Sequence, residues 1–110
     1  MMNPQVLFSK LSGLSPSEKR GESEEFFEAV FFNTGLDKVN AVLEEFLGDP
    51  FKPAGVHASA EANAAAKDYG GIHSNQTLYK TEFSGGQVIA MLWPWGNNTH
   101  TTLKIVIEKN

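Results

Sequence analysis

The strongest constraint on the fold of this chain is a charge-free segment, residues 88–95, that lies between two segments in which apolar and polar side chains alternate. Such alternation is typical of half-buried β-strands, and turn residues separate the three segments. We therefore predict a three-stranded antiparallel meander from residues 77–83, residues 88–95 and a third strand that ends near residue 108. A charge-free middle strand is expected to be covered on both faces.

The lengths of the two turns decide which side chains share a face. A two-residue loop at Gly85-Gly86 pairs Phe83 with Val88, and an even number of loop residues near Asn97-Asn98 keeps the third strand in phase. The predicted core face collects apolar side chains from all three strands: Tyr79, Thr81, Phe83, Val88, Ala90, Leu92, Leu103, Ile105 and Ile107. The opposite face carries an apolar ridge between charged flanks, and the ridge consists of Ile89, Met91, Trp93 and Trp95.

Helix signals precede the meander. Asn3-Pro4 is a typical helix start, and Ser15-Pro16-Ser17-Glu18 has the pattern of a capping box that opens a second helix, with its sturdier part at residues 24–32. Apolar residues recur every three or four positions over residues 36–47, which predicts a third helix, and the alanine-rich residues 58–67 predict a fourth.

We therefore predict a single α+β domain over residues 1–110, with three to four N-terminal helices followed by the three-stranded antiparallel meander. The helices are expected to pack mainly on one sheet face, which leaves the cover of the ridge undetermined.

Composition excludes several classes of function. The net charge is −4 and the chain has no Lys/Arg cluster, so we expect no nucleic-acid partner. The absence of cysteine excludes disulfides, thiolate metal sites and a cysteine nucleophile. An apolar run of about 20 residues, as a membrane span needs, is absent, and the N-terminus lacks the pattern of a signal peptide. We expect a cytoplasmic protein that does not bind membranes.

Catalytic and metal motifs are also missing. His57, His73 and His100 lack metal-ligand spacing, and the acidic residues 18–28 are typical of a solvated helix start. We find no serine elbow and no phosphate loop, so we expect no cofactor and favour a non-enzymatic protein. His100 is predicted to lie opposite Trp95, where an imidazole could bind an anion or act as a general acid or base; an exposed histidine beside a turn is the simpler interpretation.

The ridge leads to a functional hypothesis. It could present on the order of 400 Å² of apolar surface, which is large for one patch on a monomer. Charges of both signs beside it suit a two-fold homodimer in which Lys80 or Lys104 of one copy meets Glu82 or Glu108 of the other. We predict a small interaction module that self-associates or binds a protein partner through the sheet face, with its surface formed by Ile89, Met91, Trp93, Trp95, His100, Lys80 and Lys104.

Three alternatives remain open at this stage. One of the chain's own helices could cover the ridge. A pocket near Trp93, Trp95 and His100 could bind a small molecule or catalyse a reaction. The chain could also be a monomeric adaptor that offers its tryptophans to a larger protein.

Overall fold

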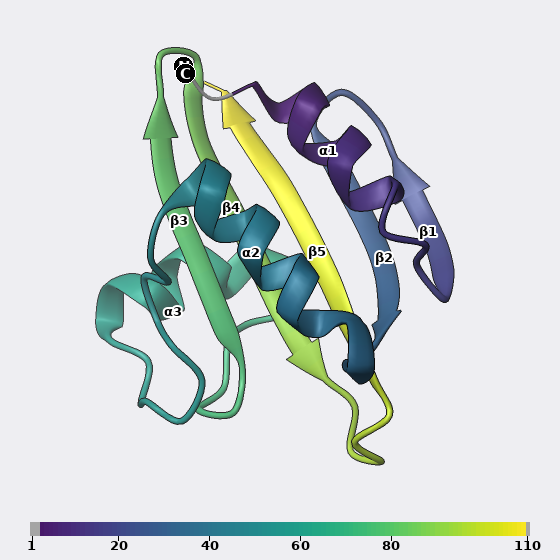
Figure 1. The fold of residues 1–110 in the computed structure, drawn as a ribbon. Coiled ribbons are helices and arrows are strands. Elements are labelled where there is room, and N and C mark those ends of the chain that lie inside the picture. Colours follow the sequence, from purple (N-terminus) through teal and green to yellow (C-terminus); the bar gives the residue numbers. More distant parts are fainter. Residues whose placement is uncertain (1–2, 110) are drawn as a thin grey trace.

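The computed structural model describes residues 3–109 and contains a five-stranded antiparallel sheet with the strand order β1-β2-β5-β4-β3 (Figure 1). The strands are β1 (Glu18–Glu22), β2 (Phe26–Phe32), β3 (Thr77–Phe83), β4 (Gly86–Pro94) and β5 (His100–Lys109). The helices are α1 (Pro4–Ser12), α2 (Leu36–Leu47) and α3 (Ala60–Ala66), with single 3-10 turns at η1 (Asn33–Gly35) and η2 (Lys67–Tyr69). Helices α1 and α2 lie on one face of the sheet and α3 lies on the other.

The prediction of three to four N-terminal helices before a three-stranded meander is wrong. Two strands, β1 and β2, precede α2 and extend the sheet beyond β5. Phe27 and Phe31 fit a helical spacing, but with Ala29 they also fit the period of a strand, and these three side chains are buried in the core. Pairing of β2 with β5, from Phe26↔Val106 to Phe32↔His100, decides between the two periods.

The predicted capping box at residues 15–18 does not open a helix, and it forms the irregular connection that leads into β1. Ser15 has a φ of 58°, and Glu18 begins β1. Strand β1 is exposed along most of its length, carries charges of both signs, and shifts its register against β2 between Lys19 and Gly21. It is therefore an irregular edge strand, of the kind that resists pairing with further strands.

The helix predictions at residues 36–47 and near residue 3 are confirmed. The side chain of Asn3 accepts hydrogen bonds from the backbone N–H groups of Gln5 and Val6, and Pro4 occupies the first turn of α1. Helix α2 has the expected bounds and buries Val39 and Leu43 on the sheet. The alanine-rich helix α3 is shorter than predicted.

The meander forms with the predicted faces and a different register. The β3–β4 loop is Ser84-Gly85, so Phe83 pairs with Gly86 rather than with Val88. This shift of two residues preserves the side-chain phase. The core accordingly contains the expected apolar side chains of the meander together with those of β2, α1 and α2.

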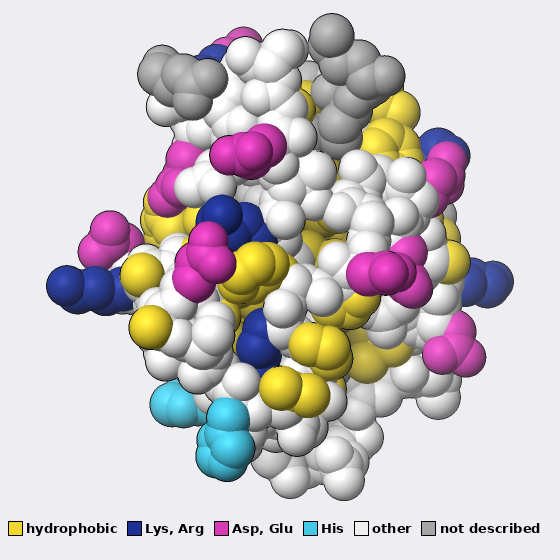
Figure 2. All heavy atoms as spheres, turned by 90° about the vertical axis from the view of Figure 1, so that its left-hand side faces the viewer, with side chains coloured by type: hydrophobic (Ala, Val, Ile, Leu, Met, Phe, Trp, Pro, Cys, Tyr) yellow, Lys and Arg dark blue, Asp and Glu magenta, His cyan; other side chains and the backbone are white. Residues whose placement is uncertain are grey.

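Helix α3 covers the part of the second face that belongs to β3 and β4. Ala62 and Ala66 pack on Leu78, Ile89 and Met91, because side chains this small let the helix approach closely. Figure 2 shows the side of the molecule that carries β3: hydrophobic side chains form small groups there between acidic and basic ones.

A buried lysine attaches the loop after α2 to the edge of β3. The backbone of Lys52 exchanges two hydrogen bonds with Leu78, of 3.0 and 2.9 Å. Its side chain is 2% exposed and its Nζ donates to the carbonyl oxygens of Ser74 at 2.7 Å and Gln76 at 2.5 Å. Burial lowers the pKa of Lys52. The lysine thus joins the segments that lead into and out of α3.

Candidate functional site

Within residues 3–109, α3 and η2 reach β5 on the second sheet face only at Val106 and Glu108, and the rest of this face over β2 and β5 is not packed against α3. Val30 and Thr102 on this side are buried, and most of the other side chains around them are aromatic or charged. We call this surface the aromatic face. It comprises Phe26, Phe32, Trp93, Trp95, His100, Arg20, Glu18, Glu28 and Lys104.

Three rings stand in a row at one end of the aromatic face. The centroids of Phe32 and His100 are 4.6 Å apart, and those of His100 and Trp95 are 4.7 Å apart. The guanidinium of Arg20 extends the row, since its central carbon lies 5.9 Å from the Trp95 ring. Phe32 is 53% exposed, the highest value among the large hydrophobic side chains that are exposed. Water therefore reaches the Phe32 end of the row, and Trp95 and His100 are partly buried.

Hydrogen bonds fix the geometry of this row. The backbone N–H of Trp95 donates to the carbonyl oxygen of His100 at 2.9 Å and closes the β4–β5 loop. The indole N–H of Trp95 donates to the hydroxyl of Thr102 at 2.9 Å. The hydroxyl of Thr99 and Nδ1 of His100 are 2.7 Å apart. The indole N–H of Trp95 and Nδ1 of His100 thus have partners within the chain.

Charges of both signs border the rings. The Nζ of Lys104 lies 5.8 Å from the centroid of Phe26 and 5.5 Å from that of Trp93. Arg20 donates through Nε to Glu18 at 2.7 Å, and its Nη1 lies 3.6 Å from Glu28. The hydrogen bond to Glu18 raises the pKa of Arg20.

The structure separates the predicted ridge into two parts. Ile89 and Met91 are 0% exposed under α3, so the expectation that they form a surface is wrong. The physical reason is that the alanines of α3 fit closely against this part of the sheet. Trp93 is half-buried, and its indole nitrogen is buried without a hydrogen-bond partner among the described atoms. Trp95 and His100 lie side by side, as predicted.

The charged residues that were predicted to border the ridge also fall into two groups. The Nζ of Lys80 lies 3.9 Å from Glu61 of α3 and 5.5 Å from the ring of Phe51. Glu108 accepts hydrogen bonds from the hydroxyl of Tyr69 and, at 2.5 Å, from the side-chain amide of Gln87. Lys80 and Glu108 are therefore occupied within the chain, whereas Lys104 lies on the aromatic face.

Sequence reasoning missed five members of this surface, namely Arg20, Phe26, Phe32, Glu18 and Glu28. All five fall in the region that was predicted to be helical. A strand period at residues 26–32 would have placed Phe26 and Phe32 on the same face as Trp95 and His100 through pairing with β5.

Within residues 3–109, the acidic and histidine side chains form no group of three or more that could hold a metal ion. His57 and His73 are exposed in the loops on either side of α3. In the same range, the helices are too short and too polar to cross a membrane.

Comparisons with protein-family models, with curated proteins and with solved structures gave no match to this chain. The aromatic face is consequently interpreted from its own residues.

Proposed function

We propose that this chain is a small non-enzymatic interaction module that self-associates through the aromatic face as a two-fold homodimer. The observation that carries the proposal is the row Phe32–His100–Trp95, whose outermost ring is 53% exposed. Aromatic rings are enriched at protein interfaces and are costly to leave in water.

The distribution of charge supports a second copy as the partner. Arg20 and Lys104 lie on the same surface as Glu18 and Glu28. Arg20 pairs with both carboxylates within one copy, so Lys104 is the cation through which this surface would reach a carboxylate of a second copy. A two-fold axis through this surface brings a cation of one copy near a carboxylate of the other. A partner whose surface carries charges of only one sign would meet like charges here, and their repulsion would disfavour its binding.

The expected interface is small, because α3 already covers Ile89 and Met91. Interfaces at the low end of the size range are typical of weak, transient association. We expect a dissociation constant on the order of 10 µM.

The test is the mass in solution as a function of concentration, measured by light scattering and sedimentation. The wild type is expected to move from 12.0 kDa toward twice that mass as the concentration passes through the dissociation constant. Phe32→Asp is expected to remain monomeric with unchanged thermal unfolding, because this ring is more exposed than buried.

Phe51→Asp is the matched control. Phe51 is also exposed, at 39%, but lies beside Lys80 and away from the aromatic face. This variant should associate like the wild type. A wild type that stays monomeric at millimolar concentration, or a Phe32→Asp variant that dimerises normally, would overturn the proposal.

A further inference from the structure

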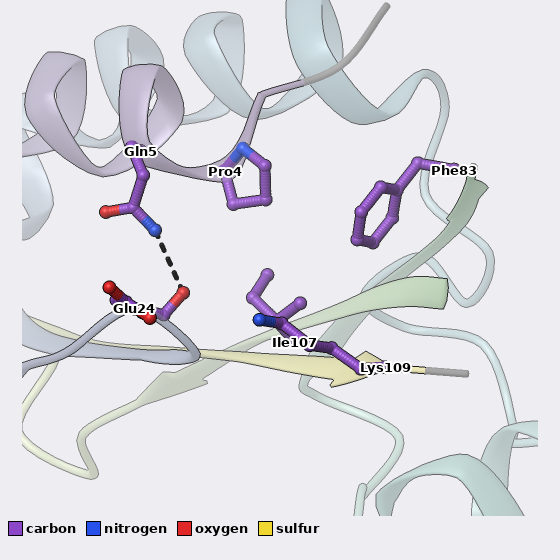
Figure 3. Close-up of a pocket in the computed structure, with 6 residues that line it drawn as sticks. All are labelled: Pro4, Gln5, Glu24, Phe83, Ile107 and Lys109. Atoms are coloured by element: carbon purple, nitrogen blue, oxygen red, sulfur yellow. Dashed lines mark hydrogen bonds between the residues drawn. The ribbon is translucent and has the colours of Figure 1, made fainter. Parts of the chain in front are cut away.

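A pocket of about 360 Å³ opens at the end of the molecule where the β3–β4 loop and the end of β5 meet the start of α1 (Figure 3). Its lining residues are Pro4, Gln5, Glu24, Phe83, Ile107 and Lys109. Phe83 and Ile107 belong to the core cluster, so the pocket lies on the sheet face opposite to the aromatic face. Its volume falls in the range of small-molecule sites.

The pocket exists because the helices stop short of this end of the sheet. Helix α2 ends at Leu47, whose carbonyl oxygen accepts a hydrogen bond from Thr81. Phe83 lies two residues further along β3, beyond the end of the helix. Helix α1 begins at Pro4, and at this end of the sheet Phe83 stays partly exposed, whereas Ile107 is 5% exposed.

The walls of the pocket are mainly apolar. Figure 3 shows Pro4 above Ile107, with Phe83 at one end and Gln5 with Glu24 at the other. The side-chain amide of Gln5 donates to the backbone carbonyl oxygen of Glu24 at 2.9 Å and closes that end. A ligand that enters between Pro4 and Ile107 would therefore place an apolar group against Phe83.

Lys109 gives the pocket a cation at its rim. Its Nζ lies 3.8 Å from the carboxylate of Glu25, and both side chains are more than half exposed, at 57% and 54%. An exposed pair at this distance is weak, so a ligand anion can compete with Glu25 for the ammonium group. The backbone donors of Gln5 and Val6 at the start of α1 are already bound to Asn3, so among the described residues that line the pocket Lys109 is the group that can recognise an anion.

We propose that this pocket binds a small amphipathic monocarboxylate. Its apolar body, of about eight carbons, lies against Pro4, Phe83 and Ile107, and its carboxylate pairs with Lys109. The described lining contains one cation, Lys109, and one acidic side chain, Glu24, so it can match no more than one negative charge on a ligand. This site is independent of the self-association proposed above, because it occupies the other sheet face.

The test is an amide NMR titration with octanoate, with octanol and octylamine as uncharged and cationic analogues. Octanoate is expected to shift the amides of Phe83, Ile107 and Lys109 in a saturable manner and to bind about threefold or more tighter than octanol. Octylamine should bind more weakly than octanol. Lys109→Gln should reduce the affinity for octanoate to that for octanol.

Two further variants separate charge from fold. Glu25→Gln removes the competing carboxylate and should tighten octanoate binding. Lys104→Gln removes a cation from the aromatic face and should leave octanoate binding unchanged, provided that circular dichroism shows both variants folded.

The proposal fails if octanol binds as tightly as octanoate, or if Lys109→Gln does not weaken octanoate. It also fails if the shifts are absent or fall on Trp95 and His100 instead of on the pocket. Phe83→Ala, which shortens one wall, should weaken octanoate and octanol alike; unchanged binding of both would overturn the assignment of the walls.

Discussion

The indole N–H of Trp95 and the hydroxyl of Thr102 form a hydrogen bond of 2.9 Å that joins the end of β4 to β5. Thr102 is 5% exposed, so the loss of this bond leaves a buried hydroxyl without its donor. The bond holds the Trp95 ring beside His100 and thereby keeps the aromatic row in one arrangement.

The first prediction concerns this pair. Trp95→Phe and Thr102→Val should each lower the free energy of unfolding by about 1 kcal/mol, and the double variant should cost less than the sum by about 0.5–1 kcal/mol. Urea unfolding of the four proteins measures the coupling. Strict additivity would show that the bond contributes nothing to stability.

The second prediction concerns the turn that begins β4. Gly86 has a φ of +149°, and an added Cβ would lie 2.0 Å from the carbonyl oxygen of Glu108 on β5. Gly86→Ala should therefore lower the free energy of unfolding by about 3 kcal/mol or more, because backbone must move on both strands. Gly96→Ala is the control: nothing lies within 4 Å of its added Cβ, and its change should stay within about 0.5 kcal/mol. Comparable denaturant midpoints for the two variants would contradict this.

The third prediction concerns Lys52. Lys52→Met removes the donor for the carbonyl oxygens of Ser74 and Gln76, and should lower the free energy of unfolding by about 1–3 kcal/mol. Amide hydrogen exchange should become faster around residues 70–76. Lys38→Met, at an exposed position of α2, should change neither quantity. Equal exchange rates in the two variants would show that Lys52 does not hold this segment.

The fourth prediction concerns alkaline pH. Desolvation, with smaller contributions from Glu44 and Asp49, raises the pKa of Tyr79 to about 12, and the hydrogen bond to Glu108 raises the pKa of Tyr69 to about 12. Unfolded tyrosine loses its proton near pH 10. Stability contributed by these tyrosines is thus complete below pH 10 and is lost as the pH rises from 10 toward 12.

Absorbance at 295 nm tests this directly. Tyrosinate should be nearly absent at pH 10.5 while circular dichroism shows the fold intact. Tyr79→Phe should flatten the decline of stability above pH 10. Half-titration of both tyrosines near pH 10 in the folded protein would refute the assignment.

The sequence predicts an element correctly where the spacing of its apolar residues fits a helix or a strand but not both. Leu36–Leu47 has apolar residues at helical spacing and polar residues between them, so a strand would expose half of its core side chains. Phe26–Phe32 is apolar on both sides and fits either period. Pairing with β5, which is distant in the sequence, makes this segment a strand, and no pattern within the segment itself indicates that pairing.

The same contrast holds for the aromatic face. Trp95 and His100 could be placed together because hairpin phase depends on loop parity alone. Burial of Ile89 and Met91 could not be predicted, since the small side chains of α3 give no sign of the surface that they cover. Phe32 could not be assigned to this face, because its segment was predicted to be a helix and not a strand.

Both outer strands of the sheet are blocked. At one edge, β1 is charged and changes register between Lys19 and Gly21; at the other, the backbone of Lys52 occupies hydrogen-bonding positions of Leu78. Neither edge is a ready template for another chain, so β-addition into an open-ended polymer is disfavoured. Copies of this protein that meet face to face would instead form a closed pair, whose growth stops at two.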